Sequence, residues 1–172
     1  MLDLLKTRRS IRKYQNKQVE KEKIDAIIKG ALMAPSSKNR KPWEFIIVED
    51  KEKLEKLSQC RENGSQLLAG APLTIVVAVD GEPYDVWIED ASIAAIIMQL
   101  TAHSLGLGTC WVHVRGRQYK DDITSEAYIK KILKIPDSPK ILCMIAIGYP
   151  DEEKAPHDEN SLLYNRIHRE KY

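Results

Sequence analysis

One predicted helix constrains the fold of this chain more than any other feature of its sequence. Residues 86–105 are expected to be helical, and the stretch from Ala91 to Leu100 is apolar nearly all round. A helix of that kind must be buried on all sides. It is too short, and too interrupted by polar residues such as Gln99 and His103, to span a bilayer. Either the chain's own core or a second copy must cover it. We favour a second copy, because a single domain of this size rarely surrounds such a helix completely.

The composition is that of a globular protein with balanced charge. Apolar residues make up 43% of the 172 residues and charged residues 30%, as in soluble domains rather than disordered or membrane chains. The 27 basic and 25 acidic residues leave a net charge of +2. This balance is too even to indicate wholesale binding to nucleic acid or to a membrane. The length fits a single domain over residues 1–172.

The cysteines and the first residues indicate a cytoplasmic protein. Cys60, Cys110 and Cys143 lie far apart and show neither a metal-ligand spacing nor a Cys-x-x-Cys spacing. An odd number of cysteines without a disulfide pattern fits a reducing compartment better than secretion. The segment from Met1 to Lys6 has an acid at position 3 and no long apolar run, so we do not expect a signal peptide.

Apolar periodicity and turn residues predict an α+β domain in which helices cover a sheet. The run 73–79 is apolar at successive positions, as expected of a strand covered on both faces. Besides residues 86–105, the expected helices are 2–6, 20–33, 51–60 and 125–133. The other expected strands are 43–48, 109–114 and 140–148. The tail over 151–172 is expected to be polar and extended, with a short helix near Leu162.

Several common catalytic motifs are missing from the sequence. It contains no Gly-x-Gly-x-x-Gly or Walker A phosphate loop and no Gly-x-Ser-x-Gly elbow. Its four histidines show no metal-ligand spacing, so no metal site is expected. His103 lies in the apolar helix, where a satisfied core histidine is a commoner explanation than a catalytic one.

The densest basic cluster lies near the N-terminus, at Arg8, Arg9, Ser10 and Arg12. Three guanidiniums and a hydroxyl within this short segment offer many donors, in the fork geometry that suits a phosphate group. A solvated basic segment is the ordinary explanation for a pair of arginines. The cluster alone leaves both explanations open.

A loop bracketed by Pro35 and Pro42 carries further polar groups, namely Ser36, Ser37 and Asn39. The two prolines stiffen this loop, so that its hydroxyls and amide can meet the polar edge of a cofactor. Viewed by itself, the loop is more commonly explained as an ordinary helix-to-strand connection.

A glycine turn follows the apolar helix. Gly106 suits the left-handed position that ends a helix. Gly108 would let the backbone at Thr109 approach a flat ligand closely. A helix C-cap alone is the commoner explanation of such a turn.

Taken together and in this order, these features resemble the nitroreductase family. That family's Arg-Arg-Ser-x-Arg-x-aromatic motif corresponds to residues 8–14. Its Ala-Pro-Ser-x-x-Asn-x-Gln-Pro-Trp-x-Phe motif corresponds to residues 34–45, with Lys41 in place of the usual glutamine. A helix that ends in Gly-Leu-Gly-x-x-Trp corresponds to 106–111, and a last strand that ends in Gly-Tyr-Pro to 148–150. Each motif is weak alone, but their joint order and spacing are specific.

The resemblance implies a central, mostly antiparallel sheet flanked by helices, in an intertwined homodimer with one FMN in each of two interface clefts. The tail 151–172 would extend over the partner subunit. The phosphate and the pyrimidine side of the flavin would be held by Arg8, Arg9, Ser10 and Arg12. The same flavin would be reached from the other subunit by Pro35, Ser36, Ser37 and Asn39. The ring would lie beside Gly108 and Thr109, with a backbone N–H near N5, and Lys154 would assist at the phosphate.

The activity that the resemblance implies is an FMN-dependent oxidoreductase. NAD(P)H would give a hydride to flavin N5, leave, and be replaced by a small conjugated acceptor such as a nitroaromatic or a quinone. FMN carries the reaction, so no catalytic side chain is expected; Arg12 would stabilise the reduced anionic flavin near N1 and O2. One alternative is an FMN enzyme of the same fold with another reaction, an enone or dehalogenating reductase. The other is a basic module that binds nucleic acid, against which the even net charge counts.

Overall fold

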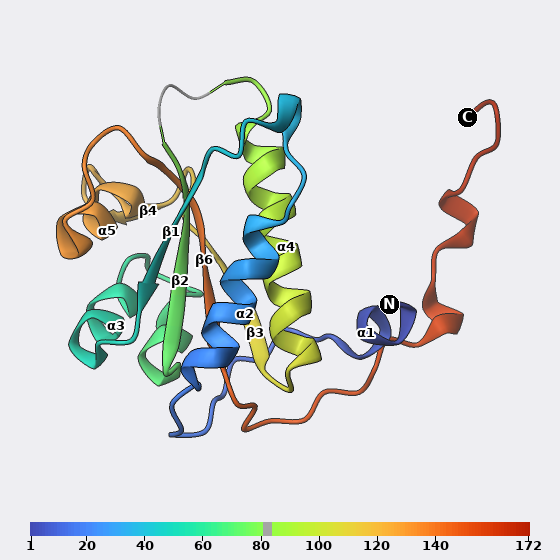
Figure 1. Ribbon diagram of the computed structural model, residues 1–172, viewed down its shortest axis with the longest axis horizontal. Coiled ribbons are helices and arrows are strands. Elements are labelled where there is room, and N and C mark those ends of the chain that lie inside the picture. Colours follow the sequence, from blue (N-terminus) through green and yellow to red (C-terminus); the bar gives the residue numbers. More distant parts are fainter. Residues whose placement is uncertain (81–83) are drawn as a thin grey trace.

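Four strands form the central sheet of the computed structural model, which describes residues 1–80 and 84–172 (Figure 1). In spatial order they are β1 (Trp43–Val48), β2 (Leu73–Val79), β6 (Lys140–Gly148) and β3 (Gly108–His113). All three pairs of neighbouring strands are antiparallel. The predicted sheet and its strands are therefore confirmed, with boundaries within a residue of those expected.

The two middle strands lie in the core of the molecule. Every residue of β2 is buried, and in β6 only Lys140 is partly exposed. In their antiparallel register Ile75 pairs with Ile145. Continuous apolar runs are required here because side chains on both faces of the sheet are covered.

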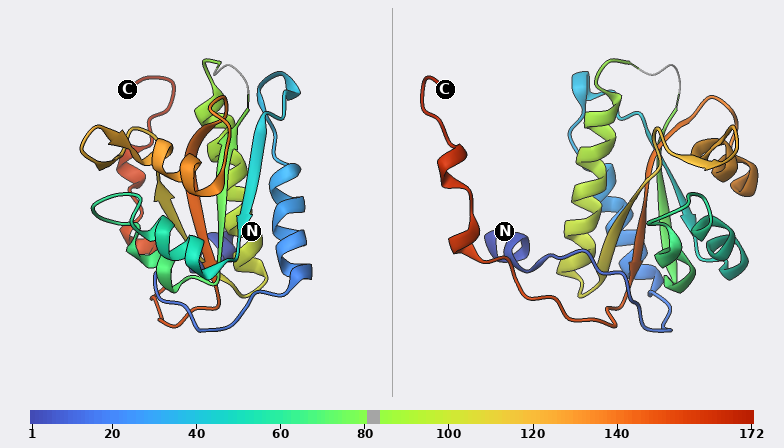
Figure 2. Two further views of the ribbon diagram at one scale, coloured as in Figure 1. Left: turned by 90° about the vertical axis from the view of Figure 1, so that its left-hand side faces the viewer. Right: turned by 180° about the vertical axis from the view of Figure 1, so that it is seen from behind.

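Helices cover both faces of the sheet (Figures 1 and 2). One face carries α2 (Lys21–Leu32) and α4 (Trp87–Ser104), and the other carries α3 (Lys51–Ser58) and α5 (Ser125–Leu133). Each pair of helices closes its own buried apolar cluster against the sheet. The four helices are those predicted from the sequence.

Local capping residues determine where several of these helices begin and end. Asp50 accepts a hydrogen bond from the backbone N–H of Lys53 and begins α3. Thr124 begins α5 in the same way, through the N–H of Ala127. Gly106, two residues after the last residue of α4, has φ +79. This is the left-handed conformation that commonly ends a helix, as predicted.

One apolar face of α4 is left uncovered in the single chain. Ala91, Ala95 and Met98 are fully buried against the sheet and α2, whereas Ile93 is 37% exposed and Ile96 40% exposed. The chain's own core therefore does not bury this helix on all sides. Among the described residues, the sheet and α2 pack along the length of α4, whereas α1 touches only its C-terminal end (Figure 2).

The two ends of the chain form an arm that projects from the body (Figures 1 and 2). It consists of α1 (Leu2–Thr7) and the tail 151–172, joined by a hydrogen bond from His157 N to Lys6 O at 2.9 Å and by an ion pair between Lys6 and Glu159 at 2.7 Å. The tail is extended, with two short 3-10 turns at Glu159–Ser161 and Tyr164–Arg166. Most of its residues are polar, as the sequence shows, and it also exposes Leu162, Leu163, Tyr164 and Ile167.

A small two-stranded ribbon lies beside the main sheet and was not predicted from the sequence. Its strands are β4 (Gln118–Lys120) and β5 (Ile123–Thr124).

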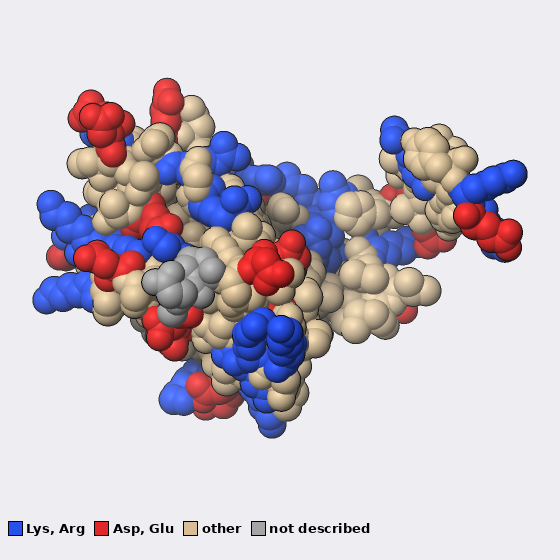
Figure 3. Space-filling view, turned by 90° about the horizontal axis from the view of Figure 1, so that it is seen from above, with Lys and Arg blue, Asp and Glu red and all other residues tan. Residues whose placement is uncertain are grey.

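The surface charges are mixed in sign. On the face shown in Figure 3, basic and acidic side chains are interspersed. No helix among the described residues is both long and apolar enough to cross a membrane.

Candidate functional site

The N-terminal basic motif lies along the ends of two core strands. Ser10 forms a parallel bridge with Thr109 at the start of β3, and Ile11 N donates to Thr109 O at 2.9 Å. Four residues later, Tyr14 forms an antiparallel bridge with Pro150, just after β6. The fold therefore brings together three of the four sequence motifs, which lie at residues 8–14, 106–111 and 148–150 of the chain.

The glycine turn accommodates this motif. A Cβ atom at Gly108 would lie 2.7 Å from Cβ of Ile11, a contact too close for any other residue. The side chain of Thr109 is 2% exposed and its hydroxyl lies 3.3 Å from Oε1 of Gln99. Because Gly108 has no side chain, Ile11 can pack directly against its backbone. The hydroxyl of Thr109 is directed into the interior.

A first cavity opens where the motif, the glycine turn and the arm meet. It has a volume of about 160 Å³, and its lining includes Arg9, Gly108 and Lys154. Lys154 pairs with Glu152 at 2.8 Å, and Arg9 donates to the carbonyl of Ala155. Arg9 and Lys154, predicted for the phosphate, and Gly108, predicted for the flavin ring, therefore line one cavity.

We expected His103 to be a satisfied histidine of the apolar core. It lies instead at the wall of the same cavity. Its Nε2 is 2.8 Å from Oγ1 of Thr7, so the imidazole is satisfied by a hydrogen bond. Partial burial, followed by the charge of Arg8, lowers the pKa of His103. The C-terminal end of α4 turns this side chain toward α1, which the sequence pattern could not show.

A second cavity, of about 390 Å³, extends along β3 from the same motif. Arg12 lines one part of it, together with Cys110 and Trp111 of β3. Arg8 and Arg12 both act on the thiol of Cys110, but burial is the larger effect and raises its pKa. Arg12 itself is exposed, and its guanidinium makes a long hydrogen bond to Ser10 O, at 3.5 Å from Nη1.

The arginines of the N-terminal motif have no carboxylate partner among the described residues. All six ion pairs of the described residues are made by lysines. Arg9 and Arg12 line the two cavities, whereas Arg8 lies beside them in the chain and lines neither. The three guanidiniums consequently keep N–H donors that no acidic side chain occupies. Such a donor set fits a phosphate group, which guanidinium forks bind with strong charge-assisted hydrogen bonds.

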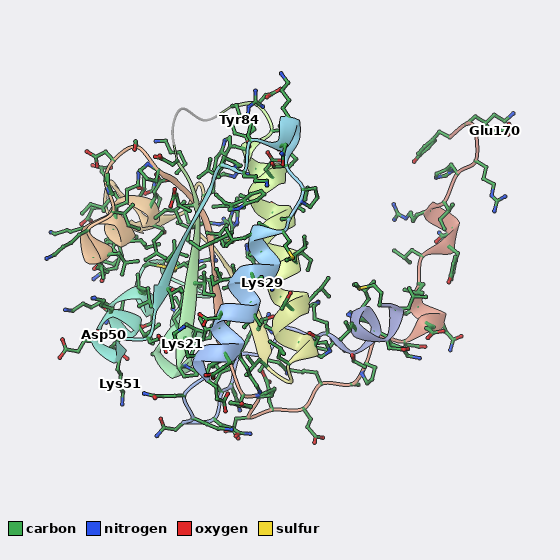
Figure 4. The ribbon with its side chains drawn as sticks, viewed as in Figure 1. Lys21, Lys29, Asp50, Lys51, Tyr84 and Glu170 are labelled. Atoms are coloured by element: carbon green, nitrogen blue, oxygen red, sulfur yellow. The ribbon has the colours of Figure 1, made fainter. Side chains whose placement is uncertain are left out.

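The polar loop after α2 is held by a buried carboxylate. Ser37 N donates to both oxygens of Asp90, at 2.9 and 3.1 Å, and Asp90 is only 3% exposed. Tyr84, labelled in Figure 4, also donates its hydroxyl hydrogen to Asp90, and the guanidinium of Arg40 lies 4.6 Å from the Tyr84 ring. Desolvation, with the bond to Asp90, raises the pKa of Tyr84 to about 12. This network fixes the loop against the first turn of α4.

The same loop has an unusual backbone. Lys38, Asn39 and Lys41 all have φ between 51 and 53, the left-handed region that non-glycine residues seldom adopt. Ser36 Oγ accepts a hydrogen bond from Lys41 N at 2.9 Å and closes the turn. A strained segment of this kind persists only where its surroundings hold it, and such segments cluster at functional sites.

The loop and the basic motif lie at opposite ends of α4. Asp90, in the first turn, contacts the loop, whereas His103, in the last turn, contacts α1 beside the motif. The 13 steps from Asp90 to His103 rise about 20 Å along the helix at 1.5 Å per residue. Within one chain, the predicted residues Pro35, Ser36, Ser37 and Asn39 are therefore not brought to the cavities that Arg9 and Arg12 line.

Comparison with known proteins identifies the family. The sequence profile described as "Nitroreductase family" matches residues 5–61 and 57–149. A protein of Archaeoglobus fulgidus whose name contains "NAD(P)H nitroreductase" is 37% identical over 99% of this chain and 98% of its own length. The chain belongs to the nitroreductase family. The fold agrees, since the solved structure of an "FMN-dependent Nitroreductase" from Clostridium difficile has a TM-score of 0.97 and 54% identity, with 100% of both chains covered.

Some proteins to which this chain is similar carry other names. An "Iodotyrosine deiodinase" of Thermotoga neapolitana is 22% identical over 95% of this chain and 95% of its own length. Family membership therefore fixes the fold and leaves the acceptor to be determined from the site.

Several residues of this nitroreductase-family site were not predicted by its motifs. The second cavity is also lined by Arg61, Gln66, His113 and Arg117. Arg61 and Arg117 lie in irregular segments, Gln66 begins a short 3-10 helix and His113 ends β3, so no periodicity singles them out. The clustering of arginines in the sequence 115–117 was the one available signal.

The described residues form no metal site. Within 1–80 and 84–172, no group of three or more His, Cys, Asp or Glu side chains is arranged to hold a metal ion. The three cysteines are free and buried.

Proposed function

We propose that this chain transfers a hydride from NAD(P)H, by way of FMN, to a small conjugated acceptor such as a nitroaromatic or a quinone. The chain is an FMN-dependent NAD(P)H oxidoreductase of the nitroreductase family, in line with the names of the C. difficile and A. fulgidus proteins. When bound, FMN supplies the redox chemistry, which leaves binding, orientation and electrostatics to the protein.

The observation that carries this proposal is the set of guanidiniums at the two cavities that have no carboxylate partner among the described residues. Arg9 and Lys154 line the first cavity, and Arg8 and Ser10 flank Arg9 in the chain; in the proposal these residues form the phosphate half of the site. Lys154 is already paired with Glu152, so we assign it an auxiliary role. Guanidinium and hydroxyl donors at this density match a phosphate monoester, which needs several charge-assisted hydrogen bonds.

Arg12 has a separate role in the proposal. Its side chain lines the second cavity and not the first, so it is available to the ring system while Arg8 and Arg9 serve the phosphate. A cation near N1 and O2 favours the reduced anionic flavin over the neutral oxidised one. Gly108 and Thr109 contribute the neighbouring backbone at the start of β3.

We further propose that the functional unit is a homodimer whose subunits share each FMN. The loop carrying Pro35, Ser36, Ser37 and Asn39 is about 20 Å along α4 from the contact beside the basic motif. A second copy, packed on the exposed face of α4, would bring its loop to the first copy's arginines. Ile93 and Ile96 supply an apolar contact for this packing.

The arm supports the same assembly. An extended segment with exposed Leu162, Leu163, Tyr164 and Ile167 has too little contact with its own chain to be covered by it. In the proposal, residues 151–172 of the single domain lie over the partner subunit. Three free cysteines agree with the cytoplasmic location that we propose.

A direct experiment tests the function. Purified protein supplied with FMN should show a flavin absorption band and about one FMN per chain, and NADH or NADPH should bleach that band anaerobically before an added quinone restores it. A protein that fails to bind added FMN contradicts the proposal. Profiling the reduced enzyme with nitroaromatics, quinones, enones and halogenated phenols separates the main proposal from an enone or dehalogenating reductase.

A further inference from the structure

Positive charge gathers at the end of β3 that lies away from the basic motif. The cavity of about 390 Å³ along this strand is lined there by Arg61, His113 and Arg117. The described residues of its lining include three arginines and no acidic residue. Arg12 is one of the three, and no motif of the sequence and no role proposed above accounts for Arg61, Arg117 and His113.

Arg61 is fixed in place without a counter-charge. Its Nη1 donates to the backbone carbonyl of His113 at 3.0 Å, and the chain folds around it at Gly64, where a Cβ atom would lie 3.2 Å from Nη2. Gly64 has φ +87, a conformation that glycine adopts readily. A half-buried guanidinium held by a carbonyl is incompletely compensated, because burying a charge is costly unless it is paired. Its remaining N–H groups are free for an anionic partner.

The arginines around His113 also affect its protonation. Burial lowers the pKa of His113, and the charges of Arg117, Arg115 and Arg61 lower it further. Trp111 Nε1 donates to His113 Nδ1 at 3.4 Å, an arrangement that leaves the proton of the neutral imidazole on Nε2. The end of the cavity thus combines fixed cations with a neutral N–H donor.

We propose that Arg61, Arg117 and His113 recognise an anionic group, a carboxylate, on the electron acceptor. The assignment rests on the proposed function, because it concerns the molecule that the FMN-loaded protein reduces. The same cavity is lined by Arg12, our proposed flavin contact. In the proposal, an acceptor that binds against the flavin in this cavity places its carboxylate near Arg61 and Arg117. A planar guanidinium pairs with a carboxylate through two parallel hydrogen bonds, which gives geometric selectivity as well as attraction.

The test compares two acceptors that differ only in charge. The FMN-loaded protein is assayed with NADH and either 4-nitrobenzoate or 4-nitrobenzamide, and the ratio of their kcat/KM values is the readout. Arg61→Gln and Arg117→Gln should each lower this benzoate-to-benzamide ratio about tenfold, as expected for one charge-assisted hydrogen bond. Calorimetric binding of 4-nitrobenzoate to the oxidised protein should weaken to a similar extent. Lys51→Gln, at the exposed start of α3 (Figure 4), removes the same charge elsewhere and should leave the ratio unchanged.

The outcomes separate this assignment from the function on which it rests. If both acceptors are reduced and neither arginine variant changes the ratio or the binding, the anion site is wrong and the proposed function stands. If the variants raise the KM for NADPH but not for NADH, with an unchanged ratio, the site serves the donor's phosphate and the acceptor assignment is wrong. If the wild-type protein binds no FMN, both proposals fail.

Discussion

Glu152 holds the backbone of Arg12: its Oε1 accepts a hydrogen bond from Arg12 N at 2.5 Å and another from Lys13 N at 3.2 Å. The second oxygen pairs with Lys154 at 2.8 Å. The bond to Lys154, followed by the backbone N–H of Arg12, lowers the pKa of Glu152 to about 2. One carboxylate after β6 therefore fixes the segment from which the side chain of Arg12 projects.

This relationship predicts a pH-dependent stability difference. A carboxyl group with a depressed pKa stabilises the fold above its unfolded value, near 4.5, and loses that contribution as the pH falls through its folded value. Glu152→Gln should thus be less stable than wild type at pH 7, and the difference should shrink between pH 4.5 and 2. Urea unfolding at several pH values measures it, with the exposed neighbour changed in Glu153→Gln as the control. A difference that stays constant over this range would contradict the assigned role.

Arg12 and Arg8 should have separable effects on the flavin. Arg12→Gln removes the proposed cation near the ring and should lower the midpoint potential of bound FMN by on the order of 30 mV, which corresponds to about 1.4 kcal/mol for two electrons. Arg8→Gln removes a proposed phosphate partner and should weaken FMN binding more than it shifts the potential. Redox titration and fluorescence titration with FMN measure the two quantities. If Arg12→Gln leaves the potential unchanged, the role assigned to Arg12 is wrong.

Asp90 should act on the flavin through the loop that it holds. Asp90→Asn places an amide where Ser37 N and the Tyr84 hydroxyl need acceptors. We expect FMN affinity to fall about tenfold, the cost of one unsatisfied buried hydrogen bond. Tyr84→Phe removes one of these bonds and leaves the carboxylate, so its effect should be smaller. Fluorescence titration gives the affinities, and melting of the FMN-free proteins shows whether the loss extends beyond the loop. Unaltered FMN affinity in Asp90→Asn would separate this loop from the cofactor.

The exposed face of α4 predicts how the protein assembles. Ile93→Glu combined with Ile96→Glu puts two charges into the proposed apolar interface, where burying an unpaired charge is strongly unfavourable. The variant should be monomeric by light scattering and should bind FMN poorly. Ile47→Glu, on the exposed side of β1, is the matched control and should remain dimeric. A wild-type protein that is monomeric with FMN bound would refute the interface.

Much of the fold was predictable because local pattern and tertiary environment agree. The continuous apolar run of β2 predicts a doubly covered strand, and Leu73–Val79 is buried throughout. By contrast, the ribbon of β4 and β5 is short and largely exposed, so neither hydrophobic alternation nor length distinguishes it from a loop. Gly106 could be placed at a helix end because the required left-handed φ is a local property.

The site was predictable only where motifs reveal it. In the sequence, Asp90 is an ordinary acidic residue in the first turn of a helix. In the fold its buried carboxylate accepts a hydrogen bond from Ser37 N, 53 residues earlier in the chain. Arg61 likewise acquires its place from the carbonyl of His113, on another element. Contacts of this kind are decided by tertiary packing, and a single sequence carries no local signal for them.

The central claim is that each FMN is shared by two subunits, and complementation between two defective chains tests it most directly. One chain carries Arg8→Gln and Arg12→Gln, and the other carries Asp90→Ala; differently tagged copies are co-expressed and the mixed dimer is isolated. Each homodimer should bind FMN weakly. In the mixed dimer one site combines both defects and the other has neither, so we predict about one tightly bound FMN per dimer, with NADH-dependent quinone reduction restored. A mixed dimer that binds FMN as weakly as its parents would mean that both halves of the site lie in one chain, which contradicts the account.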